Sequence, residues 1–325
     1  MRIAFLVNDR REPSAEQTTT LLIRAALRRG HEVLVSGVGD LSQVEDGRLL
    51  AQGCTPSEHE SAALVRQLSS GKASPRSLDD YDLCIVRTNP GRDELRRAEH
   101  VAALRLLESL EEGQVRVINS PRGLSRAFTK LSLLDVPSSL RPRTLVTRDP
   151  AAIERFLEQE SARIIIKPLD GTRGRDVFAL EPGASRENAK QIIDVVLRQG
   201  YAMVQEFVPG AERGDVRVTV VGGEILELDG RAAAVARVPS QNDFRSNLHA
   251  GGTAQAVEVS ASMREAVAQI APYLEREGLV HVGVDFVDGK ILELNVFSPG
   301  GLYPSERLYA RNFSAAVIEA FERSV

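Results

Sequence analysis

Two carboxylates and one amide near the C-terminal end of the chain have the types and spacing of a metal site. Asp285 lies in an apolar run, and Glu293 and Asn295 follow two residues apart. Because alternate residues of a strand share a face, Glu293 and Asn295 should point together while Leu292 and Leu294 point into the core. Such oxygen ligands suit a hard cation such as Mg²⁺. A solvent-exposed hairpin with ordinary polar residues would give the same pattern.

The loop between these two strands decides whether Asp285 joins the other two ligands. A two-residue loop, Asp288-Gly289, would place Asp285 on the opposite face of the hairpin. A three-residue loop that begins at Val287, with Gly289 left-handed as a bulge, would place all three ligands together. The metal hypothesis therefore predicts the three-residue loop.

A lysine and glycines in the middle of the chain have the character of a phosphate site. Lys167 ends an apolar strand, and the loop after it contains Gly171, Arg173 and Gly174. A half-desolvated lysine needs an anionic partner, and backbone N–H groups of a glycine loop can approach phosphate oxygens closely. A lysine with a buried stem, followed by a surface turn, is the alternative.

A third segment, residues 236–252, is polar and basic and ends in paired glycines. It carries Arg237, Arg245 and Asn247. These features favour a mobile loop that closes over phosphate, although a flexible surface loop has the same composition. We assign no catalytic role to His249, because no cysteine or second histidine lies near it in the sequence.

The elements that must position these clusters change character near residue 120. Before it, apolar runs at 3–7, 31–35, 83–87 and 115–118 are joined by segments that include a helical pattern at 18–29, which predicts a doubly wound parallel sheet. After it, hairpin patterns at 216–228 and 282–296 and helices at 150–160, 185–199 and 261–277 predict an α+β unit. No pattern places residues 46–80. No G-x-G-x-x-G follows the first strand, which argues against a Rossmann dehydrogenase.

Composition narrows the class of protein. A chain of 325 residues can form two or three subdomains, and its formal net charge of −4 favours neither nucleic acid nor an anionic membrane as a partner. No apolar run is long enough to span a membrane. The two cysteines, Cys54 and Cys84, form neither a disulfide framework nor a zinc pattern, so we expect a reducing cytoplasm.

Taken in order, these clusters resemble the ATP-grasp superfamily and, more narrowly, the prokaryotic-type glutathione synthetase family. The similarity extends over nearly the whole chain. It rests on Asn119-Ser120-Pro121, Thr144-Leu145-Val146-Thr147-Arg148, Lys167-Pro168-Leu169-Asp170-Gly171, Asn247-Leu248-His249-Ala250-Gly251-Gly252 and Glu293-Leu294-Asn295-Val296.

The resemblance implies an α/β fold with an α+β C-terminal part and three domains. These are an N-terminal substrate domain (1–120), a central lid (121–201) and a C-terminal nucleotide and metal domain (202–325). It also implies a role for each candidate residue. ATP would contact Lys130, Lys167, Gly171 and Gly174 through its phosphates, Gln205, Glu206 and Val208 through adenine, and Asp215 near the ribose. Asp285, Glu293 and Asn295 would hold two Mg²⁺ ions, with Mn²⁺ as a substitute, and Arg217, Arg237, Arg245 and Asn247 would stabilise the transferring phosphoryl group.

The implied function is an ATP-dependent carboxylate–amine ligase that works through an acyl phosphate. The expected substrates are γ-glutamylcysteine and glycine, and the expected assembly is a homo-oligomer. A related ligase acting on another peptide or amino acid remains open, as does a non-catalytic nucleotide-binding protein. Three positions depart from the family pattern: Arg173 replaces a glycine, Gly300 replaces a threonine, and no lysine follows Arg87. The first bears on ATP and the other two on the substrate.

Overall fold

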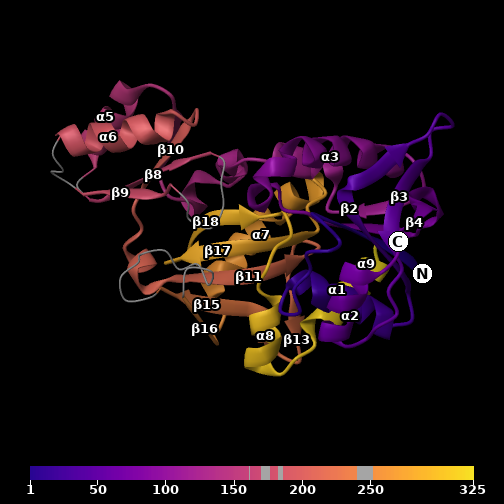
Figure 1. The fold of residues 1–325 in the computed structure, drawn as a ribbon. Coiled ribbons are helices and arrows are strands. Elements are labelled where there is room, and N and C mark those ends of the chain that lie inside the picture. Colours follow the sequence, from indigo (N-terminus) through magenta and orange to yellow (C-terminus); the bar gives the residue numbers. More distant parts are fainter. Residues whose placement is uncertain (161, 170–175, 182–185, 240–251) are drawn as a thin grey trace.

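The structure is a computed structural model of the 325-residue chain. It describes residues 1–160, 162–169, 176–181, 186–239 and 252–325. The chain forms three larger sheets, one in each third of the sequence, and a two-stranded ribbon; Figure 1 shows the central sheet standing apart at one end of the molecule. No described helix is long and apolar enough to cross a membrane.

The N-terminal sheet has the strand order β4-β3-β2-β1-β5-β6. Its strands are β1 (Arg2–Val7), β2 (Glu32–Gln43), β3 (Leu49–Cys54), β4 (Ser74–Ser77), β5 (Leu83–Arg87) and β6 (Arg116–Ile118), and its helices are α1 (Thr18–Arg28), α2 (Ser61–Ser70), α3 (Arg97–Glu111) and α4 (Pro121–Arg126). The pairs β1–β2, β1–β5 and β5–β6 are parallel as predicted. The pairs β2–β3 and β3–β4 are antiparallel, so the purely parallel prediction was wrong at this edge. The unplaced segment 46–80 forms that edge.

The central sheet is antiparallel, with the order β7-β10-β8-β9. Its strands are β7 (Thr144–Thr147), β8 (Ile164–Pro168), β9 (Phe178–Leu180) and β10 (Ala202–Glu206), and its helices are α5 (Pro150–Gln159) and α6 (Arg186–Leu197). The Asp149 side chain accepts a 3.0 Å hydrogen bond from the Ala151 N–H and caps α5, as its Asp-Pro start predicts. Because β10 pairs with β7 and β8, the predicted boundary at residue 201 cuts through this sheet, and we place it after Glu206 instead.

The C-terminal sheet is also antiparallel and has the order β16-β15-β11-β17-β18. Its strands are β11 (Asp215–Val221), β12 (Glu224–Ile225, beside β11), β15 (Ala234–Val238), β16 (Thr253–Gln255), β17 (His281–Val287) and β18 (Lys290–Asn295). A small ribbon, β13 (Glu227–Leu228) with β14 (Arg231–Ala232), adjoins it, and the helices are α7 (Ala261–Arg276), α8 (Leu302–Tyr309) and α9 (Phe313–Glu322). Short 3₁₀ helices occupy Leu78–Asp80, Pro90–Arg92, Glu94–Arg96, Lys130–Asp135, Ser138–Leu140 and Pro209–Arg213.

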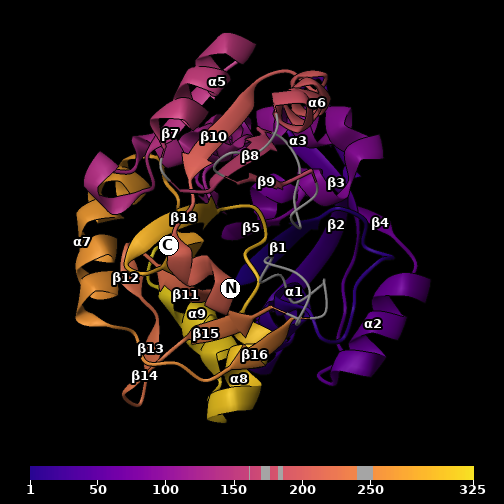
Figure 2. The ribbon, with the colours of Figure 1, turned by 90° about the vertical axis from the view of Figure 1, so that its left-hand side faces the viewer.

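A shared apolar core and a buried asparagine are among the contacts that join the N-terminal and C-terminal parts. Helix α9 packs on α1, and Phe313 and Phe321 share one core with Leu22, which brings the two ends of the chain together (Figure 2). The buried Asn119 side chain donates to the carbonyl oxygens of His281 (2.9 Å) and Val296 (3.0 Å) and accepts from the His281 N–H (2.7 Å). This asparagine, one of the motif residues, therefore holds the N-terminal sheet to the ends of β17 and β18.

Candidate functional site

The hairpin of β17 and β18 brings the predicted metal ligands together. Asp285 pairs directly with Glu293, and Asn295 pairs with Gly283, so the three side chains share one face, which confirms the predicted juxtaposition. The predicted three-residue loop was wrong. Val287 pairs with Lys290 across the two residues Asp288 and Gly289, whose φ angles of 45° and 79° suit a tight primed turn.

A bulge in β18 restores the parity that the short loop would have reversed. Phe286 pairs with Ile291 and Asp285 with Glu293, which leaves Leu292 as the extra residue. Leu292 was expected to point into the core, but it is half-buried and lines a large cavity. The bulge therefore both aligns the oxygen ligands and turns a leucine toward the site.

Asp285 lies at the centre of a network of ion pairs. Two nitrogens of Arg217 donate hydrogen bonds to its carboxylate, one of them at 2.7 Å, and Arg237 donates to the same carboxylate at 2.8 Å. Arg237 also holds Asp215 with two hydrogen bonds of 2.6 Å, and the Asn295 amide donates to Asp285 at 3.1 Å. Burial raises the pKa of Asp285, but the two arginines outweigh it and the net shift is downward.

The same balance acts on the arginine. Burial lowers the pKa of Arg237, but the charges of Asp285 and Asp215 raise it by more than burial lowers it, so the net shift is upward. Arg237 thus carries a fixed positive charge that faces the cavity beside Asp285.

Lys167 and Lys130 approach the hairpin from the central part of the chain. Lys167 pairs with Met203 across β8 and β10 and is half-buried. Burial lowers its pKa to about 8, with Glu293 opposing that shift and Lys130 adding to it. The Lys130 ammonium donates to the Leu169 carbonyl at 3.3 Å. Both lysines line a small cavity of about 100 Å³ together with Glu293 and Asn295.

The predicted adenine residues lie where β10 leaves the central sheet. The buried Gln205 amide donates to the Thr144 hydroxyl at 3.0 Å, and the Glu206 carboxylate accepts from the Arg143 N–H at 3.0 Å. These two residues and Val208 line the same large cavity as Leu292.

That cavity has a volume of about 720 Å³ and is lined by residues of all three sheets. Its lining includes ten of the predicted site residues, namely Lys167, Gln205, Glu206, Val208, Asp215, Arg217, Arg237, Asp285, Glu293 and Asn295. Four others, Gly171, Gly174, Arg245 and Asn247, lie outside the described residues, as do Arg173 and most of the predicted mobile loop in the segment 236–252. Nucleotide-sized ligands fit a cavity of this volume.

Sequence reasoning missed two kinds of lining residue. Leu292 was assigned to the core because a bulge has no marker in its sequence. Arg87 was noted only beside a departure from the family pattern, although it ends an apolar strand and is buried where it lines the cavity. A charged residue at the end of a buried strand was the available signal, the same one that pointed to Lys167.

Comparisons with known proteins find two family profiles that together match most of the chain. The profile described as "Prokaryotic glutathione synthetase, ATP-grasp domain" matches residues 129–309, and the profile of the N-terminal domain of the same enzyme matches residues 1–125. A "Glutathione synthetase" of Synechococcus elongatus is 33% identical over 337 residues, covering 100% of this chain and 99% of the relative. One from Vibrio cholerae is 32% identical over 300 residues, covering 92% of this chain and 89% of the relative.

Solved structures share the fold at low identity. D-cycloserine synthetase DcsG has a TM-score of 0.63 at 18% identity, covering 98% of this chain and 99% of its own. The macrocyclase MdnC from Microcystis aeruginosa, bound with its precursor peptide, has a TM-score of 0.65 at 15% identity, covering 99% of this chain and 100% of its own. At these identities the likeness concerns the fold alone.

Proposed function

The chain belongs to the prokaryotic glutathione synthetase family of ATP-grasp, peptide-bond-forming ligases, and we propose that the cavity of about 720 Å³ is where it joins γ-glutamylcysteine to glycine. One observation carries this proposal. A lysine and two arginines converge with two carboxylates and an amide in a single cavity, and they come from strands of two different sheets. Phosphoryl transfer needs such positioning and positive charge more than it needs a nucleophilic side chain.

We assign the nucleotide to the wall between the central and C-terminal sheets. Gln205, Glu206 and Val208 hold the base, and Leu292 supplies apolar surface against it. The phosphates extend toward Lys167, whose lowered pKa reflects a charge that is desolvated and incompletely balanced. An anionic ligand there would restore the ordinary pKa of this lysine.

Further residues complete the nucleotide site in this proposal. Lys130, Gly171 and Gly174 contact the phosphates, and Asp215 lies near the ribose. The glycines belong to the loop after β8, outside the described residues.

The oxygen ligands of the hairpin fit Mg²⁺, with which ATP-grasp ligases bind ATP. Asp285, Glu293 and Asn295 share one face and line the same cavity as the arginines. We propose that they hold two Mg²⁺ ions, or Mn²⁺ in their place, which would neutralise phosphate charge and orient the phosphates when bound. Asp285 is held by Arg217 and Arg237 in this structure, so a bound metal would share its carboxylate with these arginines.

The proposed reaction has two steps. A carboxylate oxygen of the dipeptide attacks the γ-phosphorus of ATP, and ADP leaves, which gives an acyl phosphate. The amine of glycine then attacks the acyl carbon, phosphate leaves with the electrons of the carbon–oxygen bond, and the nitrogen loses a proton. Arg217 and Arg237 face the position of the transferring group, and Arg245 and Asn247 complete this set in the proposal.

A coupled assay of ADP release tests the proposal. The purified protein is given ATP, Mg²⁺ and γ-glutamylcysteine with glycine, or with alanine, serine or β-alanine as the amine. ADP release that requires both γ-glutamylcysteine and glycine is the expected result, with glutathione identified by mass spectrometry. Release that requires another amine would replace glycine in the proposal. Light scattering tests the expected homo-oligomer in the same preparation.

A further inference from the structure

The wall of the cavity that we assign to the base includes a short connector between β10 and β11, residues 207–214. The connector contains the 3₁₀ helix Pro209–Arg213. Its residues Val208, Ala211 and Gly214 line the cavity of about 720 Å³. The position of the connector therefore decides the shape of this wall.

Arg163 ties one side of the connector to the central sheet. The Phe207 N–H donates to the Arg163 carbonyl at 3.1 Å, and the Arg163 guanidinium lies 4.7 Å from the centre of the Phe207 ring. The same guanidinium forms an ion pair with Glu212 at 3.1 Å. Because Arg163 directly precedes β8, these contacts fix the connector relative to the central sheet.

Asp288, in the turn between β17 and β18, ties the other side to the C-terminal sheet. The Gly210 N–H donates to Oδ2 of Asp288 at 2.9 Å, and an Arg213 nitrogen donates to Oδ1 at 3.2 Å. Gly210 is buried, and a buried N–H without an acceptor is unfavourable. One carboxylate thus holds the 3₁₀ helix against the hairpin that carries Asp285 and Glu293.

Gly210 is needed for this contact because the carboxylate comes so close. A Cβ added at Gly210 would lie 2.3 Å from Oδ2 of Asp288 and 2.4 Å from its Cγ. Any side chain there would push the carboxylate away from the N–H. A substitution at Gly210 or at Asp288 should therefore break the same contact.

The turn by itself does not account for this role of Asp288. A second Asp-Gly turn, Asp229-Gly230 between β13 and β14, has φ angles of 50° and 70°, close to the 45° and 79° of Asp288-Gly289. Aspartate and glycine suit the left-handed φ of both turns. Asp229 forms an ion pair with Arg311 at 3.2 Å, whereas Asp288 accepts from a buried N–H of the connector. The contact with the connector is thus separate from the formation of the turn.

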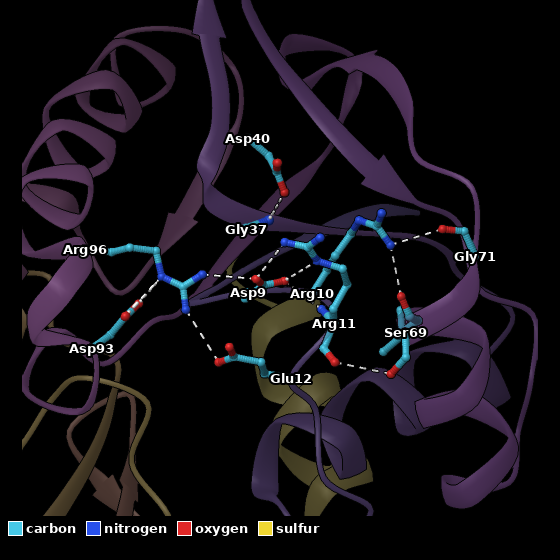
Figure 3. Close-up of polar contacts among 11 residues, drawn as sticks. Asp9, Arg10, Arg11, Glu12, Gly37, Asp40, Ser69, Gly71, Asp93 and Arg96 are labelled. Carbon is cyan, nitrogen blue, oxygen red and sulfur yellow. Dashed lines mark hydrogen bonds and ion pairs between the residues drawn. The ribbon is translucent and has the colours of Figure 1, made fainter.

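The N-terminal part of the cavity is held by contacts of its own (Figure 3). The Asp9 carboxylate accepts from Arg96 at 3.0 Å, and Arg96 also contacts Glu12 at 3.4 Å. Asp9 and Glu12 line the cavity. A change at Asp288 removes none of these contacts, so the N-terminal part serves as an internal control.

We propose that Asp288 is a positioning residue for the nucleotide. It holds the connector at the turn of the hairpin and so fixes the wall for the base relative to the proposed metal ligands Asp285 and Glu293. The inference rests on the proposed function, since it takes ATP and Mg²⁺ at the places assigned above. A wall that is already in place leaves less of the chain to be ordered on binding, which raises the affinity for ATP.

Calorimetry with the β,γ-imido analogue of ATP and Mg²⁺ tests the contact. Asp288 is exposed, and glycine adopts its left-handed φ without strain, so Asp288→Gly should fold and keep the turn. It should weaken binding of the analogue roughly 3- to 10-fold, the range for one lost hydrogen bond. Asp288→Asn keeps an acceptor for the Gly210 N–H and should stay within about 2-fold of the wild type.

The second Asp-Gly turn supplies the matched control. Asp229→Gly makes the same exchange at a similar φ, and Asp229 does not line the cavity, so the affinity for the analogue should not change. Unchanged affinity in Asp288→Gly, or an equal loss in Asp229→Gly, overturns the proposal.

A double-mutant cycle tests whether Gly210 and Asp288 act through one contact. Gly210→Ala should weaken binding of the analogue by about as much as Asp288→Gly. In the double variant, Gly210→Ala should add less than about 2-fold, because the carboxylate that it displaces is already absent. Losses that multiply in the double variant would contradict a shared contact.

Michaelis constants separate positioning from a general structural role. Asp288→Gly should raise the KM for ATP roughly 3- to 10-fold. The kcat and the KM for γ-glutamylcysteine should stay within about 2-fold, since the contacts of the N-terminal part are intact. Equal rises in the two KM values would make Asp288 a structural residue and refute its role in positioning.

The two assays also separate this inference from the proposed function. Ligation of glycine by the wild type, with unchanged affinity for the analogue in Asp288→Gly, would refute the inference and leave the proposed function standing. Weaker binding in Asp288→Gly, with no ligation of glycine by the wild type, would support the inference and refute the proposed substrates.

Discussion

Replacing Lys167 by methionine should stabilise the unliganded protein while weakening ATP binding. Methionine is unbranched and similar in length to the apolar stem of lysine, so it fills the same half-buried position of β8 without the charge. Burial, opposed by Glu293 and reinforced by Lys130, lowers the pKa of Lys167 from 10.5 to about 8. At about 1.4 kcal/mol for each pKa unit, this difference corresponds to a destabilisation of about 3 kcal/mol at neutral pH.

The pH dependence follows from linkage. Below pH 8 the lysine is protonated in both the folded and the unfolded state, so the full destabilisation is present. Between pH 8 and 10.5 the unfolded chain binds more protons than the folded chain, and the wild type gains stability as the pH rises. Above pH 10.5 this contribution has vanished.

Urea denaturation between pH 7 and 10.5 measures the effect. The stability of Lys167→Met minus that of the wild type should fall by about 3 kcal/mol across this range. Changes in packing shift the stability difference between Lys167→Met and the wild type by the same amount at every pH, so they do not alter its dependence on pH. Lys190→Met removes the same charge from an exposed position in α6 and is the control for the change in net charge.

ATP binding provides the second half of the test. Lys167→Met should weaken binding of a non-hydrolysable ATP analogue roughly 10- to 100-fold by calorimetry, because a charge-assisted contact with phosphate is lost. A stability difference that stays flat from pH 7 to 10.5 would refute the electrostatic reasoning. Unchanged affinity for the analogue would make this lysine structural.

Three further predictions concern the backbone, an ion pair and the metal ligands. Gly214→Ala should lower the free energy of unfolding, measured with urea, by at least about 2 kcal/mol, because φ is +113° and the new Cβ would lie 2.0 Å from the Arg237 carbonyl oxygen. Gly200→Ala, with φ +115° and open space around the new Cβ, should lower it by only about 1 kcal/mol. Equal losses in the two variants would contradict the clash. Arg29 and His31 hold the pKa of Glu322 at about 2, so Glu322→Gln should be less stable than the wild type at pH 7 by roughly 1–3 kcal/mol. This difference in stability should shrink as the pH falls from 4.5 toward 2, because the wild-type carboxylate becomes protonated. A difference that stays constant with pH would exclude this linkage. Asp285→Asn should lose about 3–5 kcal/mol of stability in thermal denaturation, since it leaves two arginines without their shared carboxylate. It should also raise the Mg²⁺ concentration needed for activity, which a Mg²⁺ titration measures. An unchanged Mg²⁺ requirement would remove Asp285 from the proposed metal site.

The sequence predicted most elements near the site because they depend on local patterns. The strand at 83–87 and the cap of α5 by Asp149 were found as predicted. The edge strand β4 was not predicted, because it is short and partly exposed and its residues show no apolar alternation. Lys167 was found because a charged residue that ends an apolar strand stands out in the sequence.

The hairpin of β17 and β18 shows where local patterns stop. Alternation along the strand correctly placed Glu293 and Asn295 on one face. The sequence also predicted that Asp285 lies beside Glu293 and Asn295, but it attributed this arrangement to a three-residue loop. A bulge at Leu292 in β18 produces it instead. Leucine occurs in regular strands and in bulges alike, so its sequence carries no sign of the extra residue.

The sequence by itself determined the order of the elements, the residue types of the site and the resemblance to a family, because each is written in short spacings. The tertiary structure alone decided which charges meet. Arg217 reaches Asp285 across 68 residues of sequence, and Arg87 reaches Pro299 across 212. Strand order and packing bring these residues together, and burial then decides whether each charge has a partner within the protein or needs one from a ligand.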